Sequence, residues 1–142
     1  MVMRDRIKEK LGDKIKEWND SSSKRIYLSI DKQDIFKAAE IFIKQLELRF
    51  ITASAVELPQ AFELLYHFSN DPCGEIYTLR FLLEDKANPE IASISPLFPG
   101  GEWIESEIWE MFGIKFSGHP NLRKLLLAED WPQDKYHLRK EK

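Results

Sequence analysis

The strongest constraint on the fold comes from two neighbouring stretches, residues 62–68 and 75–84, in which every second side chain is apolar. These side chains are Phe62, Leu64, Tyr66 and Phe68 in the first stretch and Tyr77, Leu79, Phe81 and Leu83 in the second. Because successive side chains of a strand point to opposite faces, each stretch predicts a strand with one buried face. Residues 70–74 between them, Asn-Asp-Pro-Cys-Gly, are typical of a turn. The two strands are therefore expected to form an antiparallel hairpin.

Three further strands and a helix are expected around this hairpin. Residues 25–30, 50–58 and 91–95 have the composition of short strands, and residues 31–48 carry apolar side chains at helical spacing. The expected buried side of that helix consists of Ile35, Ala38, Ala39, Phe42 and Leu46, with Phe36 also expected in the core. The pattern predicts an α+β fold, with a mostly antiparallel or mixed sheet of about five strands and helices packed on it.

Residues 3–18 have the pattern of an amphipathic helix, with apolar residues at spacings of four, four and three: Ile7, Leu11, Ile15 and Trp18. Two roles for this helix stay open, because it could pack on its own domain or serve as a docking arm for another subunit. We divide the chain of 142 residues, as one domain, into this N-terminal helix (1–20), an α+β core (25–97) and a signature segment with an irregular tail (98–142).

The composition argues against several classes of protein. Cys73 is the single cysteine, whereas an iron–sulfur cluster normally takes four cysteine ligands, so we expect no such cofactor. The net charge of -3 gives no general electrostatic basis for nucleic-acid binding. No apolar run reaches the roughly 20 residues that span a bilayer, so we expect membrane contact only indirectly, through a partner.

From residue 98 onward the sequence is rich in tryptophan, glycine and paired charges. After a turn at residues 99–101 we expect a helix over residues 102–112, capped by Gly113. The apolar face of this helix contains Ile104, Ile108, Met111 and Phe112. The other side carries Glu102, Glu105, Glu107 and Glu110. This cluster of carboxylates is expected to be solvated or to meet basic partners, such as Arg123, Lys124 or a second subunit.

Residues 105–114 (Glu-Ser-Glu-Ile-Trp-Glu-Met-Phe-Gly-Ile), followed by Phe116 and residues 118–123 (Gly-His-Pro-Asn-Leu-Arg), resemble the signature of the C subunit of NADH:quinone oxidoreductase. This is the respiratory-chain NADH dehydrogenase 30 kDa subunit family, whose members also occur in energy-converting nickel–iron hydrogenases. Ser106 stands where the family usually has arginine, and Glu110 and Asn121 stand where it has aspartate. Because the arginine is a bidentate ion-pair donor, the ion pairs of the family cannot be transferred directly.

The resemblance implies a non-catalytic structural subunit without a cofactor, peripheral on the cytoplasmic side of the cell membrane and without redox activity of its own. The implied partners are the large subunit, which holds the quinone or nickel–iron site, and a neighbouring iron–sulfur subunit. The short tail after residues 138–140 and the Asp-Trp-Pro sequence at 130–132 favour an energy-converting hydrogenase type of complex. The C subunit of an NADH (or related donor):quinone oxidoreductase is the alternative.

We expect the docking surface on this signature segment. The residues chosen for partner contact, or for holding the loop in shape, are Glu105, Glu107, Trp109, Phe112, Gly113, Phe116, His119, Pro120 and Arg123. Aromatic and arginine side chains are enriched in the cores of interfaces. The competing interpretation is internal: Trp109 and Phe112 belong to the core, and Arg123 bridges Glu107 or Glu110.

Three other functions have weaker support. An enzyme could use His67, His119 or His137 as acid or base, but the sequence lacks a nucleophile elbow, an HExxH motif and a phosphate-binding loop. His119 is therefore expected to be a structural hydrogen-bonding residue. A metal site could use Glu105, Glu107, Glu110 and His119. Residues 119–142 hold six Lys or Arg against four Asp or Glu, a balance that suits a protein partner better than nucleic acid.

Overall fold

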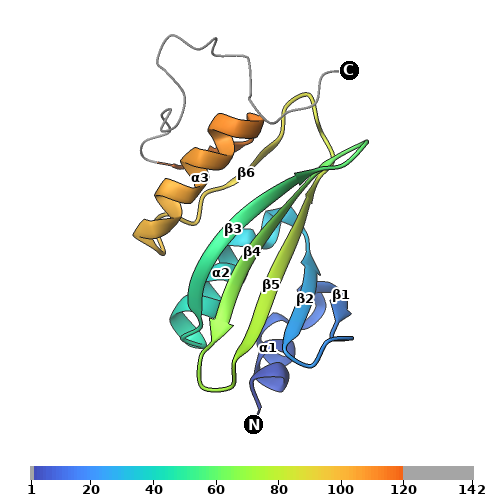
Figure 1. Cartoon of the computed structure of the whole chain (residues 1–142), viewed down its shortest axis with the longest axis vertical. Helices are drawn as coiled ribbons and strands as arrows, with labels where there is room; N and C mark the ends of the chain where they lie inside the picture. The colour runs from blue at the N-terminus through green and yellow to red at the C-terminus, as the bar shows by residue number, and fades with distance from the viewer. Residues whose placement is uncertain (1, 120–142) are drawn as a thin grey trace.

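The computed structural model of the chain describes residues 2–119. Helices and short helical turns alternate with strands along the chain (Figure 1). The helices are α1 (Met3–Leu11), α2 (Ile35–Glu40) and α3 (Pro99–Phe112), with 3₁₀ turns at Gly12–Lys14 and Lys32–Asp34 and a π-helical turn at Ile41–Gln45. The strands are β1 (Ile15–Asn19), β2 (Arg25–Ile30), β3 (Arg49–Glu57), β4 (Phe62–Asn70), β5 (Glu75–Leu83), β6 (Glu90–Ala92) and β7 (Lys115–Ser117).

Five strands form the main sheet, in the order β1-β2-β5-β4-β3. The β2–β5 pair is parallel, and the other three pairs are antiparallel. The helices α1 and α2 pack on the same side of this sheet, where their apolar side chains join the core. The α+β fold with a mostly antiparallel, mixed sheet is thereby confirmed.

The predicted hairpin is confirmed as β4 and β5. Its register joins Phe62 to Leu83, Leu64 to Phe81, Tyr66 to Leu79 and Phe68 to Tyr77, and all eight side chains are buried. Gly74 closes the turn with a φ of 70° and donates its amide to the carbonyl of Asn70 at 2.9 Å. Glycine suits this position because it takes a positive φ without a steric penalty.

The helix after β2 buries the predicted stripe, with one exception. Phe42 lies edge-on to Phe68, with ring centroids 5.1 Å apart, and Ile35 is also fully covered. Phe36 was expected in the core, but its side chain is 37% exposed. Successive residues of a helix point about 100° apart, so the residue after a buried one turns out of the core. The prediction for Phe36 was wrong for this reason.

The N-terminal helix is shorter than the sequence pattern indicated. It ends at Leu11, where Gly12 takes a φ of 54°, and Ile15 and Trp18 lie on β1 instead. Trp18 pairs with Leu28 of β2, so β1 supplies an edge strand of the main sheet. Ile7 and Leu11 are buried in the shared core, which supports packing on the chain's own domain over a free docking arm.

The strand expected near residues 91–95 is β6, and it lies outside the main sheet. It pairs with β7 in a separate two-stranded parallel sheet, with Ile91 opposite Phe116. The helix α3 connects these two parallel strands, which require a long crossover rather than a tight turn. Within residues 2–119, none of the helices is both long and apolar enough to cross a membrane.

Candidate functional site

The helix α3 and the residues that follow it form the candidate site, because they carry the predicted signature. Pro99 occupies the first turn of α3, so the turn expected at residues 99–101 is the beginning of the helix. Proline is common there because its missing amide would have no partner in the helix. Gly113 ends the helix with a left-handed φ of 80° and donates to the carbonyl of Trp109 at 2.8 Å, as its predicted cap role requires.

The side chain of Glu105 is buried, with 0% exposure. Ser93 donates its hydroxyl to Oε1 at 2.5 Å, while the amide of Ile94 and the hydroxyl of Tyr66 donate to Oε2 at 3.1 and 3.0 Å. One carboxyl group thus joins α3 to β4 and to the segment after β6. The prediction of a solvated row of carboxylates was wrong at this position, because three donors replace water.

Burial raises the pKa of Glu105, and the hydrogen bonds from Ser93, Ile94 and Tyr66 oppose that rise. Burial also raises the pKa of Tyr66 well above its usual value, and the neighbouring carboxylate adds to this effect. The Tyr66 hydroxyl therefore keeps its proton and acts as a donor. A carboxyl group held by three donors inside the protein serves as a polar anchor for packing.

Glu110 is also buried, with 2% exposure, so two of the four glutamates of α3 do not lie on an exposed face. The helix α3 is partly covered by β3 and β7, both of which it contacts. Glu102 and Glu107 are partly exposed. Half of the predicted acidic face therefore belongs to the interior.

The side chain of His119, which follows β7, lies beside the first turns of α3. Its Nε2 atom lies 2.8 Å from the carbonyl oxygen of Glu102 and 3.3 Å from the hydroxyl of Ser106. Because a carbonyl oxygen can only accept, Nε2 is the donor in this contact, which agrees with the structural hydrogen-bonding role expected for His119. Ser106, at the position where arginine was expected, is buried beside this ring.

The aromatic residues of the signature contact the core. Phe116 is buried on β7, and Trp109 and Phe112 are partly buried against the same core. The ring of Phe112 lies 5.9 Å from that of Phe62. This arrangement agrees with the internal interpretation for Trp109 and Phe112, while partner contact at Glu107, Gly113 or Phe112 stays a prediction. Pro120 and Arg123 lie outside the described residues.

The geometry also bears on the metal and enzyme hypotheses. Between residues 2 and 119, no three His, Cys, Asp or Glu side chains come together as metal ligands would. His67 has Nδ1 at 2.8 Å from the Thr78 hydroxyl, and burial lowers its pKa, as does the charge of Arg25. Its Nε2 atom lies 3.5 Å from the Ser54 hydroxyl, so Ser54 of β3, His67 of β4 and Thr78 of β5 form a row of polar contacts across three strands. His137 lies outside the described residues.

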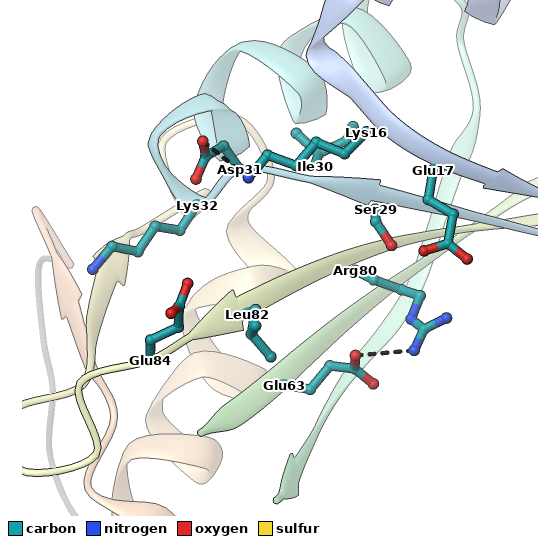
Figure 2. A pocket seen from close by; sticks show the side chains of 10 residues that line it. All are labelled: Lys16, Glu17, Ser29, Ile30, Asp31, Lys32, Glu63, Arg80, Leu82 and Glu84. Atoms are coloured by element: carbon teal, nitrogen blue, oxygen red, sulfur yellow. Dashed lines mark hydrogen bonds and ion pairs between the residues drawn. The ribbon is translucent and has the colours of Figure 1, made fainter. Parts of the chain in front are cut away.

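A polar pocket of about 320 Å³ lies on the face of the sheet opposite α2 (Figure 2). Lys16 reaches Asp31 at 3.1 Å, and Arg80 reaches Glu63 at 3.0 Å, as the dashed lines show. Each of these charges thus has an ion-pair partner: Lys16 of β1 pairs with Asp31, which follows β2, and Arg80 of β5 pairs with Glu63 of β4. The pocket therefore has a structural explanation, since opposite charges on neighbouring strands commonly pair on the surface of a sheet.

A comparison with known families decides the assignment. The model of the family described as "Respiratory-chain NADH dehydrogenase, 30 Kd subunit" matches residues 28–142. The chain belongs to this family. The match includes the signature segment and most of the main sheet, and it confirms the resemblance seen in the sequence.

Curated relatives carry related names. The chain is 31% identical to the NADH-quinone oxidoreductase C subunit of a Nocardioides species over 114 residues, which cover 75% of this chain and 45% of that protein. It is 29% identical to the C subunit of Chloroherpeton thalassium over 140 residues, covering 95% and 57%. It is 40% identical over 75 residues to the C/D subunit of Photorhabdus laumondii, covering 52% and 12%. The chain thus spans less than two thirds of the length of these relatives.

Two solved structures share the fold. One is the structure of the membrane-bound sulfane sulfur reductase, an archaeal respiratory membrane complex, with a TM-score of 0.83, 20% identity and coverage of 96% of this chain and 81% of that chain. The other is a trypsin-resistant fragment of Nqo5, with a TM-score of 0.69, 18% identity and coverage of 86% and 100%. At these identities the likeness establishes the architecture.

Proposed function

We propose that this family member is a non-catalytic structural subunit, without a cofactor, of a membrane-associated electron-transfer complex. The observation that carries the proposal is the family match over residues 28–142. Relatives whose names give a fused C/D subunit combine two subunits in one chain, which supports the large subunit as the docking partner. A neighbouring iron–sulfur subunit and a cytoplasmic, peripheral location belong to the same proposal.

The geometry of α3 suits a docking role. Glu105 and His119 fix the helix and the segment after it through hydrogen bonds to β4, to Ile94 and to the Glu102 carbonyl. A surface held by its own supporting contacts loses little freedom when a partner binds, so less binding energy is lost to ordering. Trp103, which is 58% exposed, lies on this helix and offers a large aromatic contact that was not among the predicted docking residues.

Two classes of complex fit this subunit. The Asp-Trp-Pro sequence at residues 130–132 favours an energy-converting hydrogenase type, whereas the names of the curated relatives favour an NADH-quinone oxidoreductase. The gene for the large subunit distinguishes them, because a nickel–iron site needs cysteine ligands. A large subunit with two Cys-x-x-Cys motifs would indicate the hydrogenase type, and a large subunit of the quinone type without them would indicate the oxidoreductase.

The proposal is tested by purifying the tagged chain from membranes of its native host in mild detergent. We expect it to migrate with a large subunit of one of these two classes, identified by mass spectrometry. The purified chain itself is expected to show no flavin or iron–sulfur absorption and no turnover. Recovery of the chain alone from every membrane preparation, or redox activity of the chain alone, would overturn the proposal.

A further inference from the structure

A groove of about 190 Å³ lies between the edge strand β3 and the helix α3. On the strand side it is lined by Ala53, Ser54 and Ala55. Successive side chains of a strand point to opposite faces, so lining by three consecutive residues agrees with a groove along the edge of the strand. β3 is the last strand of the sheet order, and its other side is paired with β4. The groove therefore follows the edge of the sheet that no other strand within residues 2–119 pairs with.

The opposite wall of the groove is a single stripe of α3. The lining residues recur at spacings of three, one, three and one along the helix: Ile104, Glu107, Ile108, Met111 and Phe112. Residues three and four apart share one face of a helix, so this stripe faces β3 as a unit. The helix runs beside the strand in Figure 1, and the two elements are in contact. The edge of β3 thus faces a stripe of α3 that is apolar except for the carboxylate of Glu107.

The size and the backbone chemistry of the groove favour a peptide over a small ligand. Small-molecule sites usually measure about 300–1,000 Å³, and the groove is smaller at about 190 Å³. An edge strand presents backbone N–H and C=O groups along its open side. Within residues 2–119, the backbone–backbone hydrogen bonds of Ala53, Ser54 and Ala55 are those of the pair with β4, and the Thr52 hydroxyl also lies 3.5 Å from the Ala53 carbonyl oxygen. An added strand would satisfy the groups on the other side.

Charge specifies one property of the occupant. The helix α3 contains four glutamates and no lysine or arginine, and Glu105 and Glu110 are buried. Glu107 is partly exposed in the wall of the groove, and residues 2–119 supply no ion-pair partner for it. A basic side chain beside the added strand would meet this carboxylate.

We propose that the groove receives an extended segment of a partner polypeptide, which continues the sheet as a strand beside β3. One aliphatic side chain of that segment enters the groove, and a lysine or arginine lies opposite Glu107. The inference rests on the proposed function, because it assigns the mode by which the chain docks in its complex. According to this proposal, β3 contacts the partner polypeptide in addition to the aromatic residues of the signature segment.

The first test is residue-resolved amide hydrogen exchange of β3, in the chain alone and in the complex purified from its native host. Amides of residues 52–56 that face away from β4 should exchange rapidly in the chain alone. In the complex their exchange should slow at least about tenfold, while the amides already paired with β4 change little. Unchanged exchange of β3 in a complex that contains the chain would overturn the inference and leave the proposed function standing.

The second test reverses the charge in the groove. Glu107→Lys should reduce recovery of the complex at least about fivefold, because a like charge would face the basic side chain of the segment. Glu102→Lys, on the same helix but outside the groove, is the matched control and should keep recovery near the unsubstituted level. Full recovery with Glu107→Lys would overturn the assignment of the basic side chain to this position. Absence of any complex, even with the unsubstituted chain, would instead contradict the proposed function.

Two other occupants give distinct results in the same experiments. If residues 120–142 of this chain fill the groove, the outward amides of β3 are already protected in the chain alone and lose protection when those residues are deleted. If a second copy fills it, the chain alone is a dimer in light scattering, and Glu107→Lys changes that state. Either result would overturn the proposal of a partner segment.

Discussion

The β4–β5 hairpin and the helix α3 are both largely covered, but they are buried by different chemistry. In the hairpin the inward positions are apolar, and each is covered by neighbours such as Phe42 and Phe50. In α3 the buried positions include Glu105, Ser106 and Glu110 beside Ile108 and Met111. The comparison indicates that apolar burial follows a local pattern, whereas polar burial depends on partners that lie elsewhere in the chain.

The largest effect is expected from the hairpin side of this comparison. Phe68→Ala should lower the free energy of unfolding by about 3–5 kcal/mol, because truncation of a buried phenylalanine leaves a cavity. Phe68 is fully buried between Phe42 and Phe50, with ring distances of 5.1 and 5.5 Å. Leu82→Ala on the exposed side of β5 is the control and should cost about 1 kcal/mol or less. Urea unfolding followed by circular dichroism measures both. Equal losses would show that the inward face is not the stabilising one.

The next effect concerns the polar anchor of α3. Glu105→Ala should cost about 2–4 kcal/mol, because the Ser93 hydroxyl, the Ile94 amide and the Tyr66 hydroxyl would stay buried without their acceptor. Glu107→Ala, two residues away and partly exposed, should cost about 0.5 kcal/mol or less. The same unfolding experiment compares them. If the two variants were equally stable, Glu105 would be no more than a surface residue and the contrast between the regions would fail.

Much of the fold could be predicted because its causes are local. The alternation of Phe62–Asn70 and the glycine at position 74 lie within one hairpin, and Gly113 ends a helix whose apolar residues are adjacent in sequence. The burial of Glu105 could not be predicted in this way. Its donors Tyr66 and Ser93 are 39 and 12 positions away, and only the packing of α3 brings them together.

The N-terminal segment shows an intermediate case. The spacing of Ile7, Leu11, Ile15 and Trp18 predicted one helix over residues 3–18. The structure places Ile15 and Trp18 on β1, where pairing with β2 stabilises an extended backbone, whereas a short helix is only marginally stable by itself. Here long-range pairing overrode a helical pattern that was correct only as far as Leu11.

A smaller loss of unfolding free energy should distinguish the contribution of the Tyr66 hydroxyl from those of the other two donors to Glu105. Tyr66→Phe removes the hydroxyl that donates to Glu105 at 3.0 Å and leaves the ring packed against Phe81. The expected loss is about 1–2 kcal/mol, which is less than for Glu105→Ala, because Ser93 and Ile94 still donate. Adding Tyr66→Phe to Glu105→Ala should cost less than the sum of the two single losses, since the contact is already absent. Strict additivity in this double-mutant cycle would show that the two groups do not interact.

The smallest effect is a change of stability with pH, and its sign follows from the raised pKa of Glu105. As pH rises through the ordinary glutamate range, the unfolded chain releases this proton before the folded protein does. Fewer protons are then bound to the unfolded state, so the free energy of unfolding falls with rising pH until the folded pKa is passed. The contribution is present at low pH and is lost above the folded pKa. Glu105→Gln has no such proton, so the stability of the unsubstituted protein relative to this variant should decline as pH rises from the ordinary glutamate range through the folded pKa.

Unfolding by urea at a series of pH values measures that decline, and each unit by which the folded pKa is raised corresponds to about 1.4 kcal/mol. Other ionisable groups are common to both proteins, so their contributions cancel in the difference. Glu107→Gln controls for the loss of one carboxylate from α3. A relative stability that rises with pH would mean that the three donors lower the pKa of Glu105 more than burial raises it. In that case Glu105 would be a charged anchor, and α3 would depend on an ion where the hairpin depends on apolar contact.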